Sequence, residues 1–165
     1  MKNLLLIAMS LFLALGCNAQ SKSEKEDMTE YKVQKSDEEW RKELSDEQYY
    51  VLREKGTERP GTGEYNLHFE DGLYKCAACS TPLFESDSKF ESHCGWPSFD
   101  KAISEKSVVE KKDYSFGMVR TEILCGTCGG HLGHVFEDGP TETGMRYCIN
   151  SAALGFKKEE GSEKK

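Results

Sequence analysis

The sequence predicts a mainly β domain of antiparallel strands, preceded by two short helices. Two capping-box patterns lie close together around residue 40, and no long amphipathic helical repeat follows Tyr50. From Leu67 onward, the apolar runs are short, rich in β-branched and aromatic residues, and interrupted by Gly, Pro or Asp, as in strands joined by turns. With 165 residues, the chain has room for one domain and some appendages.

Residues 1–16 have the pattern of an export signal, with Lys2 as the positive end and an apolar run over residues 4–15. The run is too short to cross a bilayer comfortably, because a spanning helix needs about 20 residues. It ends at Gly16-Cys17, which resembles a bacterial lipoprotein box with lipidation at Cys17; cleavage after Ala19 is the alternative. In both cases we expect the mature protein to be exported, and we favour a lipid anchor in the bacterial cell envelope, facing the periplasm or on a surface membrane.

The elements follow in order. Residues 17–35 and 157–165 are polar and charged, and we expect a flexible tether and a solvated tail on either side of a domain spanning residues 36–156. The capping boxes at Ser36 and Ser45 predict helices over residues 37–43 and 46–54, whose buried contacts should be Trp40, Leu44, Tyr49 and Leu52. Strands are predicted over residues 72–76, 82–84, 107–112, 115–122, 134–136 and 145–149.

The charge balance excludes one class of partner. The formal net charge is -7, whereas nucleic-acid phosphates require a basic surface. The same balance gives no polybasic attraction to anionic lipid, so we expect membrane contact through the lipid anchor only.

Two Cys-x-x-Cys pairs, Cys76–Cys79 and Cys125–Cys128, predict a metal centre. Four thiolates in two such pairs suit tetrahedral zinc, and one structural Zn2+ would join two distant hairpins of a domain with a limited core. Three alternatives remain: a redox centre in one pair, disulfides in an oxidising compartment, and a local Cys2His2 set that adds His131 and His134 to the second pair. The last would leave the first pair without a role, and we favour the four-cysteine site.

Cys148 and Cys94 are the cysteines left over. In an extended segment Arg146, Cys148 and Asn150 project from one face, and a guanidinium near a thiol favours the nucleophilic thiolate. Cys94 precedes Gly95 in a turn that also contains Pro97, which is a poor place for an inert core thiol. The two cysteines therefore suggest a nucleophile and a resolving partner. The alternative for Cys148 is a buried cysteine in a core strand.

Three further positions complete the candidate site. Trp96 stands in the turn after Cys94, where it either lines a pocket or belongs to the core. His131 and His134, with Asp138, lie in a glycine-rich stretch and offer hydrogen-bond donors and a proton relay; lone histidines are more often structural.

The sequence resembles the type B methionine sulfoxide reductases, enzymes that reduce the R epimer of methionine sulfoxide. The resemblance covers about residues 36–156 and is carried by both Cys-x-x-Cys pairs and four segments: Arg53-Glu54-Lys55-Gly56-Thr57-Glu58-Arg59-Pro60, Cys94-Gly95-Trp96-Pro97-Ser98-Phe99, His131-Leu132-Gly133-His134-Val135-Phe136 and Arg146-Tyr147-Cys148-Ile149-Asn150-Ser151. It implies two antiparallel sheets that form a small open barrel.

The resemblance also implies roles for individual residues. Cys148 would attack the sulfoxide sulfur and become a sulfenic acid, which Cys94 would convert to a disulfide that a thioredoxin-like donor reduces. The departing oxygen would be polarised and protonated by His131, His134 and Asn150. Asp138 would orient the histidines, Arg146 would lower the thiol pKa, and Trp96 would hold the substrate's S-methyl group. We expect a monomer acting on oxidised proteins or peptides.

Overall fold

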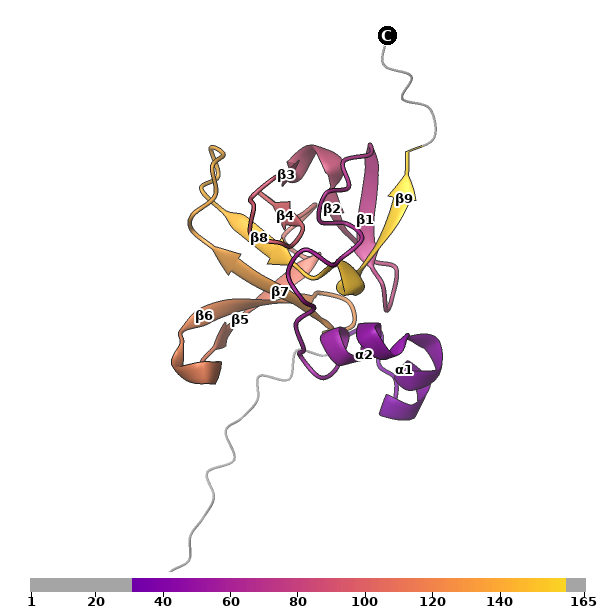
Figure 1. The fold of residues 1–165 in the computed structure, drawn as a ribbon. Coiled ribbons are helices and arrows are strands. Elements are labelled where there is room, and N and C mark those ends of the chain that lie inside the picture. Colours follow the sequence, from indigo (N-terminus) through magenta and orange to yellow (C-terminus); the bar gives the residue numbers. More distant parts are fainter. Residues whose placement is uncertain (1–30, 160–165) are drawn as a thin grey trace, which may run out of the picture.

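The computed structural model describes residues 31–159 (Figure 1). The export signal at residues 1–16, the anchor at Cys17, most of the tether and the end of the tail lie outside the described residues. Within residues 31–159, no helix is both long enough and apolar enough to cross a membrane.

Two short helices open the domain, α1 (Asp37–Glu43) and α2 (Asp46–Leu52). Both begin with the predicted capping box, in which the serine side chain and the third-residue side chain each satisfy a backbone N–H at the helix start. The four predicted contacts are buried, and they join the helices to the core: Trp40, Leu44, Tyr49 and Leu52. The second helix ends at Leu52, two residues before the predicted end.

The rest of the domain consists of two antiparallel sheets, which confirms the predicted fold class. One sheet has the order β2-β1-β9 and the other the order β3-β4-β8-β7-β6-β5, and neither closes on itself in the part of the chain described. The strands are β1 (Gly72–Cys76), β2 (Pro82–Glu85), β3 (Lys89–Phe90), β4 (Ser98–Phe99), β5 (Val108–Asp113), β6 (Arg120–Cys125), β7 (His131–Phe136), β8 (Arg146–Ile149) and β9 (Leu154–Lys158). Three short 3-10 turns interrupt them: η1 (Ser86–Ser88), η2 (Ser115–Gly117) and η3 (Ser151–Ala153).

The predicted strand over residues 115–122 is wrong in its first half. Residues 115–117 form η2, the turn between β5 and β6, and the strand starts at Arg120 and runs to Cys125. The turn wins because Gly117 adopts a positive φ of 71°, which ends an extended segment. The strands β3, β4 and β9 were not predicted.

The packed domain is longer at both ends than residues 36–156. The backbone N–H of Val33 donates to the carbonyl of Thr127 at 3.0 Å, and the Val33 side chain packs on the core. At the other end β9 reaches Lys158, because residues 157 and 158 pair with Leu73 and Gly72 of β1.

The two sheets enclose one core of aromatic side chains. Tyr74 of β1, Phe84 of β2 and Phe99 of β4 are all fully buried. The rings of Phe84 and Phe99 stack with centroids 4.4 Å apart, and Tyr74 meets Phe99 edge-on at 5.0 Å. This core fixes β4 against β8, the strand that carries Cys148.

Candidate active site and metal centre

The four cysteines of the two Cys-x-x-Cys pairs come together at one point. Cys76 ends β1 and Cys125 ends β6, and the Sγ atoms of all four cysteines lie within 4.8 Å of one another. The Sγ atoms of Cys76 and Cys128 are 3.7 Å apart, and those of Cys79 and Cys125 are 3.6 Å apart. Four sulfurs bound to zinc at about 2.3 Å stand roughly 3.8 Å from one another, so this cluster fits a tetrahedral ion without rearrangement.

The structure disfavours the rival ligand sets. All four cysteines are free thiols, and the histidines of the local Cys2His2 alternative are engaged elsewhere, His131 with Glu122 and His134 with Asp113. A metal ion at the cluster would tie the end of β1, in the smaller sheet, to the end of β6, in the larger one.

Cys148 lies at the centre of the larger sheet and faces Cys94. In β8 it is directly opposite Ser98 of β4 on one side and His134 of β7 on the other. Its Sγ is 3.7 Å from the Sγ of Cys94, which belongs to the loop before β4. That loop turns at Gly95, whose φ is +96° and where a Cβ would lie 2.7 Å from Pro60. Cys94 and Cys148 are both half-buried and reduced.

The two thiols compete for a proton. The hydrogen bond from Cys148 lowers the pKa of Cys94 to about 4, and the hydroxyl of Ser92, which donates to Cys94 Sγ at 2.9 Å, acts in the same direction. The pKa of Cys148 is raised, by its hydrogen bond to Cys94 first and then by burial. The positive charge of Arg146 opposes this shift, as predicted, but is outweighed while the two sulfurs are in contact.

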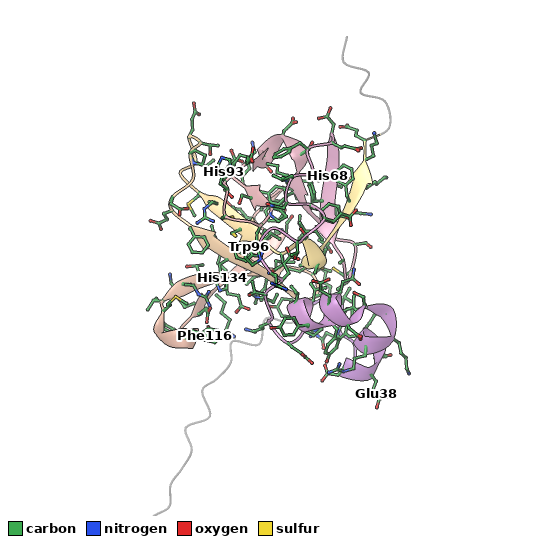
Figure 2. The ribbon with its side chains drawn as sticks, in the orientation of Figure 1. Glu38, His68, His93, Trp96, Phe116 and His134 are labelled. Carbon is green, nitrogen blue, oxygen red and sulfur yellow. The ribbon has the colours of Figure 1, made fainter. Side chains whose placement is uncertain are left out.

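A small pocket opens beside Cys148. Its volume is about 120 Å3, and its walls are Thr57, Trp96, Arg120, Gly133, His134, Phe136, Cys148 and Asn150. Figure 2 shows Trp96 and His134 near each other at the middle of the molecule. Trp96 is half-buried, and its indole N–H donates to the carbonyl of Glu58 at 3.2 Å. Of the alternatives considered for Trp96, the structure therefore supports the pocket wall.

The two histidines reach the same side of the sheet through a bulge. Between Ile123 and Leu124 the register of β6 against β7 shifts, so that Leu132 is an extra residue in β7. His131 and His134, three positions apart, consequently face each other with ring centroids 5.5 Å apart. A regular strand would place them on opposite faces.

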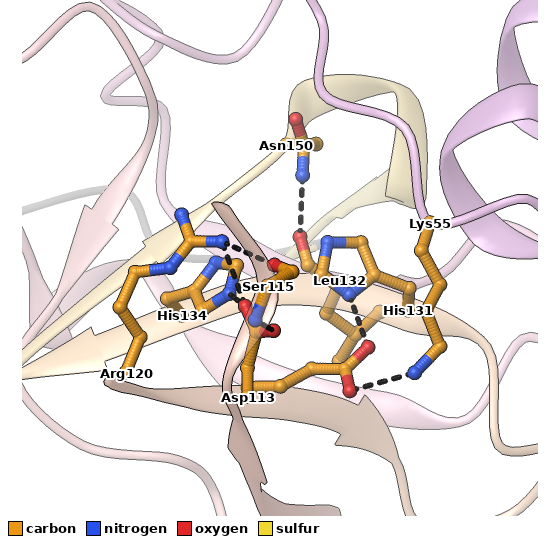
Figure 3. A network of polar contacts seen from close by, with 9 residues as sticks. Lys55, Asp113, Ser115, Arg120, His131, Leu132, His134 and Asn150 are labelled. Atoms are coloured by element: carbon orange, nitrogen blue, oxygen red, sulfur yellow. Dashed lines mark hydrogen bonds and ion pairs between the residues drawn. The ribbon is translucent and has the colours of Figure 1, made fainter. Parts of the chain in front are cut away.

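Each histidine is held by its own carboxylate (Figure 3). His131 Nδ1 donates to Glu122 Oε1 at 2.7 Å, and both side chains are buried. His134 Nε2 donates to Asp113 Oδ2 at 2.8 Å. Burial lowers the pKa of His134, although Asp113 acts against it, so the ring is neutral at neutral pH. Burial alone would raise the pKa of Glu122, but hydrogen bonds from His131 and Lys55 outweigh it and the net shift is downward.

The predicted role of Asp138 is wrong. Its carboxylate accepts two hydrogen bonds from Arg146, from Nε and from an Nη, both at 2.8 Å, whereas Glu122 and Asp113 orient the histidines. The hydrogen bonds from Arg146 lower the pKa of Asp138. Asp138 thus fixes the guanidinium, which also lies over the Phe136 ring at 4.5 Å, and acts on the thiol only through it.

Glu58 is the residue of this site that the sequence did not reveal. Its backbone N–H donates to Asn150 Oδ1 at 3.1 Å and its carbonyl accepts from Trp96, so one residue holds two pocket walls. Its carboxylate accepts the backbone N–H groups of Ser151 at 2.7 Å and Ala152 at 2.8 Å. Asn150 is buried, and one N–H of its amide donates to the carbonyl of Leu132 at 2.9 Å. A glutamate amid Gly, Thr and Pro, three residues before Gly61, carried no periodic signal.

Paired sulfurs at this distance exchange electrons by making and breaking a disulfide, so the fold and site define a thiol-dependent oxidoreductase. Comparison with known proteins narrows the class. The SelR domain family model matches residues 44–158. Proteins named peptide methionine sulfoxide reductase MsrB are similar to this chain. The one from Agrobacterium fabrum is 58% identical over 130 residues, covering 79% of this chain and 96% of its own length.

Two more distant organisms give the same result. The MsrB proteins of Bradyrhizobium diazoefficiens and Leptospira interrogans are 62% and 59% identical, covering 76% and 78% of this chain and 91% and 98% of their own lengths. The chain belongs to the SelR-domain family of type B methionine sulfoxide reductases.

Proposed function

We propose that this enzyme reduces the R epimer of methionine sulfoxide, free or in oxidised proteins, through a cycle of Cys148 and Cys94. The family membership supports the reduction of methionine sulfoxide by a thiol reductant. The observation that carries the finer assignment is the 3.7 Å separation of the two sulfurs at a pocket walled by Trp96 and His134.

In the first step the Cys148 thiolate attacks the sulfur of the sulfoxide. The sulfur–oxygen bond of the substrate breaks, the oxygen leaves with a proton as a hydroxyl on Cys148, and methionine is released; Cys148 is thereby oxidised to a sulfenic acid. His134 lies opposite Cys148 across the strand pair, where it can hold the proton for this oxygen. The second N–H of the Asn150 amide and the ring of His131 complete the donors.

Trp96 would take the S-methyl group. Sulfur and methyl groups next to a sulfoxide pack favourably on aromatic rings, and the ring is fixed in the pocket wall by its hydrogen bond to Glu58. With the methyl group against Trp96 and the oxygen toward His134 and Asn150, only one epimer presents its sulfur to Cys148. This arrangement supports selectivity for the R form.

In the second step Cys94 attacks the sulfenic acid. A Cys94–Cys148 bond forms, the hydroxyl leaves as water with the proton from Cys94, and a dithiol donor of the thioredoxin type then reduces the disulfide. The pKa of about 4 at Cys94 supports a thiolate ready for this attack. For the first step, Cys94 must move away from Cys148, because its hydrogen bond keeps the pKa of Cys148 high. Arg146 then remains to favour the Cys148 thiolate.

The four-cysteine cluster would hold one Zn2+ with a structural role. The sulfur geometry suits it, and the cluster is remote in sequence from both redox cysteines. Bound there, the ion supplies no redox chemistry and stabilises the connection between the two sheets.

The enzyme would act outside the cytoplasm as a lipid-anchored monomer. The apolar run ending in Gly16-Cys17 supports this location. Intact mass spectrometry of the mature chain from a membrane fraction should show a lipid on Cys17, and Cys17→Ala should release the enzyme. A lipid-free chain beginning at Gln20 would instead indicate cleavage after Ala19.

An epimer-resolved assay of Cys148→Ser tests the proposed chemistry. Separate R and S sulfoxides of N-acetyl-methionine are supplied with a dithiol reductant, and methionine formation is followed. The unaltered enzyme should reduce only the R form, and Cys148→Ser should be inactive while keeping its metal and fold. Turnover by Cys148→Ser, or equal use of both epimers, would remove the proposal.

A further inference from the structure

The hairpin between β5 and β6 carries an apolar tip that the fold leaves uncovered. We call residues 114–119 the hairpin tip. Four large apolar side chains there are exposed to 70%, 89%, 48% and 72%: Tyr114, Phe116, Met118 and Val119. The other exposed large apolar residues of the described chain are spread over the loop before β1, α2 and the loop after β4. Figure 2 shows Phe116 on a hairpin that projects from the molecule.

The turn at this tip has an unfavourable residue at its most exposed position. Met118 N–H donates to the carbonyl of Ser115 at 3.1 Å, and the two central residues, Phe116 and Gly117, both have positive φ, 54° and 71°. This is the pattern of a type I′ turn, whose first central position favours Asn, Asp or Gly. Neither the backbone preference nor burial accounts for a phenylalanine there.

The base of the same hairpin forms part of the active site. Asp113, which ends β5, holds His134, and it also accepts from Arg120 at 2.7 Å. Arg120, which begins β6, lines the pocket beside Cys148 and contacts the Ser115 hydroxyl at 3.2 Å. The hairpin tip and the pocket are therefore continuous, as the network in Figure 3 shows for Asp113, Ser115, Arg120 and His134.

The size of the pocket determines what must lie beside it. A volume of about 120 Å3 accommodates a methionine sulfoxide side chain and little more. The backbone and the neighbouring residues of a protein substrate must then rest on the rim, which the hairpin provides on one side. Methionine is a core residue, and its oxidation disrupts cores, so the residues around a sulfoxide in a damaged protein are mostly apolar.

We propose that the hairpin tip is the docking surface for the polypeptide that flanks the methionine sulfoxide, and that it selects segments with apolar flanking residues. This inference rests on the proposed function, because the substrate must place its sulfoxide in the adjacent pocket. It adds the substrate class: unfolded or partly unfolded polypeptide with apolar sequence around the sulfoxide.

The test uses Phe116→Asn in the full chain. Asparagine suits the first central position of a type I′ turn, so the variant removes the ring and leaves the hairpin intact. Phe116→Asn/Val119→Thr removes a second apolar side chain while keeping a β-branched residue. The matched control is Leu67→Asn, which removes an apolar side chain of 67% exposure from the loop before β1. Substrates are a peptide with apolar residues flanking methionine-R-sulfoxide, a peptide with polar flanks, and N-acetyl-methionine-R-sulfoxide.

We expect Phe116→Asn to lower kcat/KM for the apolar peptide roughly five- to tenfold, through KM, and the double variant to lower it further. Activity on N-acetyl-methionine-R-sulfoxide should not change in any variant, and Leu67→Asn should match the unaltered enzyme on all substrates. Equal losses on the peptide and the small substrate, or no loss on either, would overturn the docking role.

Two other occupants of the tip give distinct results. If the unaltered enzyme binds phosphatidylglycerol vesicles and Phe116→Asn does not, while peptide kinetics are unchanged, the tip contacts lipid and the inference is overturned. If Phe116→Asn only converts a dimer to a monomer by light scattering, a second copy covers the tip and the inference is likewise overturned. An unaltered enzyme that reduces neither peptide nor small R-sulfoxide would refute the proposed function itself.

Discussion

Replacing Glu58 with glutamine tests how the pocket is held together. The side chain is 5% exposed, and its two carboxylate oxygens accept backbone N–H groups from Ser151 and Ala152 at 2.7 and 2.8 Å. The glutamine side chain offers one oxygen and one NH2 group, so one of these N–H groups loses its acceptor and faces another donor. The substitution keeps the volume of the side chain and removes little else.

The cost follows from that lost acceptor. An unsatisfied buried donor destabilises by about 1–3 kcal/mol, which for a domain of this size lowers Tm by roughly 4–12 °C. Burial already raises the pKa of Glu58, so the neutral amide recovers part of the desolvation cost, and we expect the lower half of that range. Because the Glu58 backbone holds Trp96 and Asn150, kcat/KM for the R-sulfoxide should fall on the order of tenfold at temperatures where the variant is fully folded.

Thermal melts and steady-state kinetics on N-acetyl-methionine-R-sulfoxide measure both effects. Glu64→Gln is the matched control, because Glu64 is an exposed glutamate of the same loop, and it should leave Tm and kcat/KM unchanged. A lower Tm with unchanged kcat/KM would mean that Glu58 stabilises the fold without positioning the pocket. An unchanged Tm would refute the hydrogen-bond reasoning itself.

Three further predictions concern the metal, the histidines and acid stability. Cys76→Ser should lose its metal by elemental analysis and melt at a markedly lower temperature; full metal content would contradict the four-cysteine site. Glu122→Gln should lower kcat roughly tenfold or more, because the glutamine amide cannot both orient His131 and carry the charge beside it; an unchanged kcat would show that His131 needs no carboxylate. Stability should fall as the pH drops from 7 to 4, since the pKa values of His134 and Asp113 are lowered in the folded state and the unfolded chain binds more protons. The part due to His134 is present above pH 6.5, its ordinary pKa, and is lost below that; that of Asp113 is lost below about pH 4, and melts at constant or rising Tm on acidification would contradict both.

Local chemistry accounts for the parts of the fold that the sequence predicted well. The helix starts at Ser36 and Ser45 depend on side chains within four residues, so the capping boxes placed them correctly. The two Cys-x-x-Cys pairs were grouped correctly because four thiols near one ion form a chemical requirement that does not depend on the path of the chain.

Long-range pairing accounts for the errors and omissions. The strands β3 and β4 have only two residues each, which is too short for any alternation to be visible. The carboxylates at Glu122 and Asp113 serve the histidines only because a bulge and a hairpin bring β5, β6 and β7 into register. Asp138 was assigned to the histidines because it follows them closely in the sequence, whereas the turn before β8 returns it to Arg146. A charged residue in the apolar run Thr121–Cys125 was the one available sign of the role of Glu122.

The most direct test of the two-cysteine cycle is mass spectrometry after exposure to methionine-R-sulfoxide without any reductant. We expect the unaltered enzyme to form one methionine per chain and a Cys94–Cys148 disulfide, and Cys94→Ser to form one methionine and retain one added oxygen on Cys148. A disulfide that involves any other cysteine, or an added oxygen on Cys94 in place of Cys148, would contradict the assignment of nucleophile and resolving cysteine.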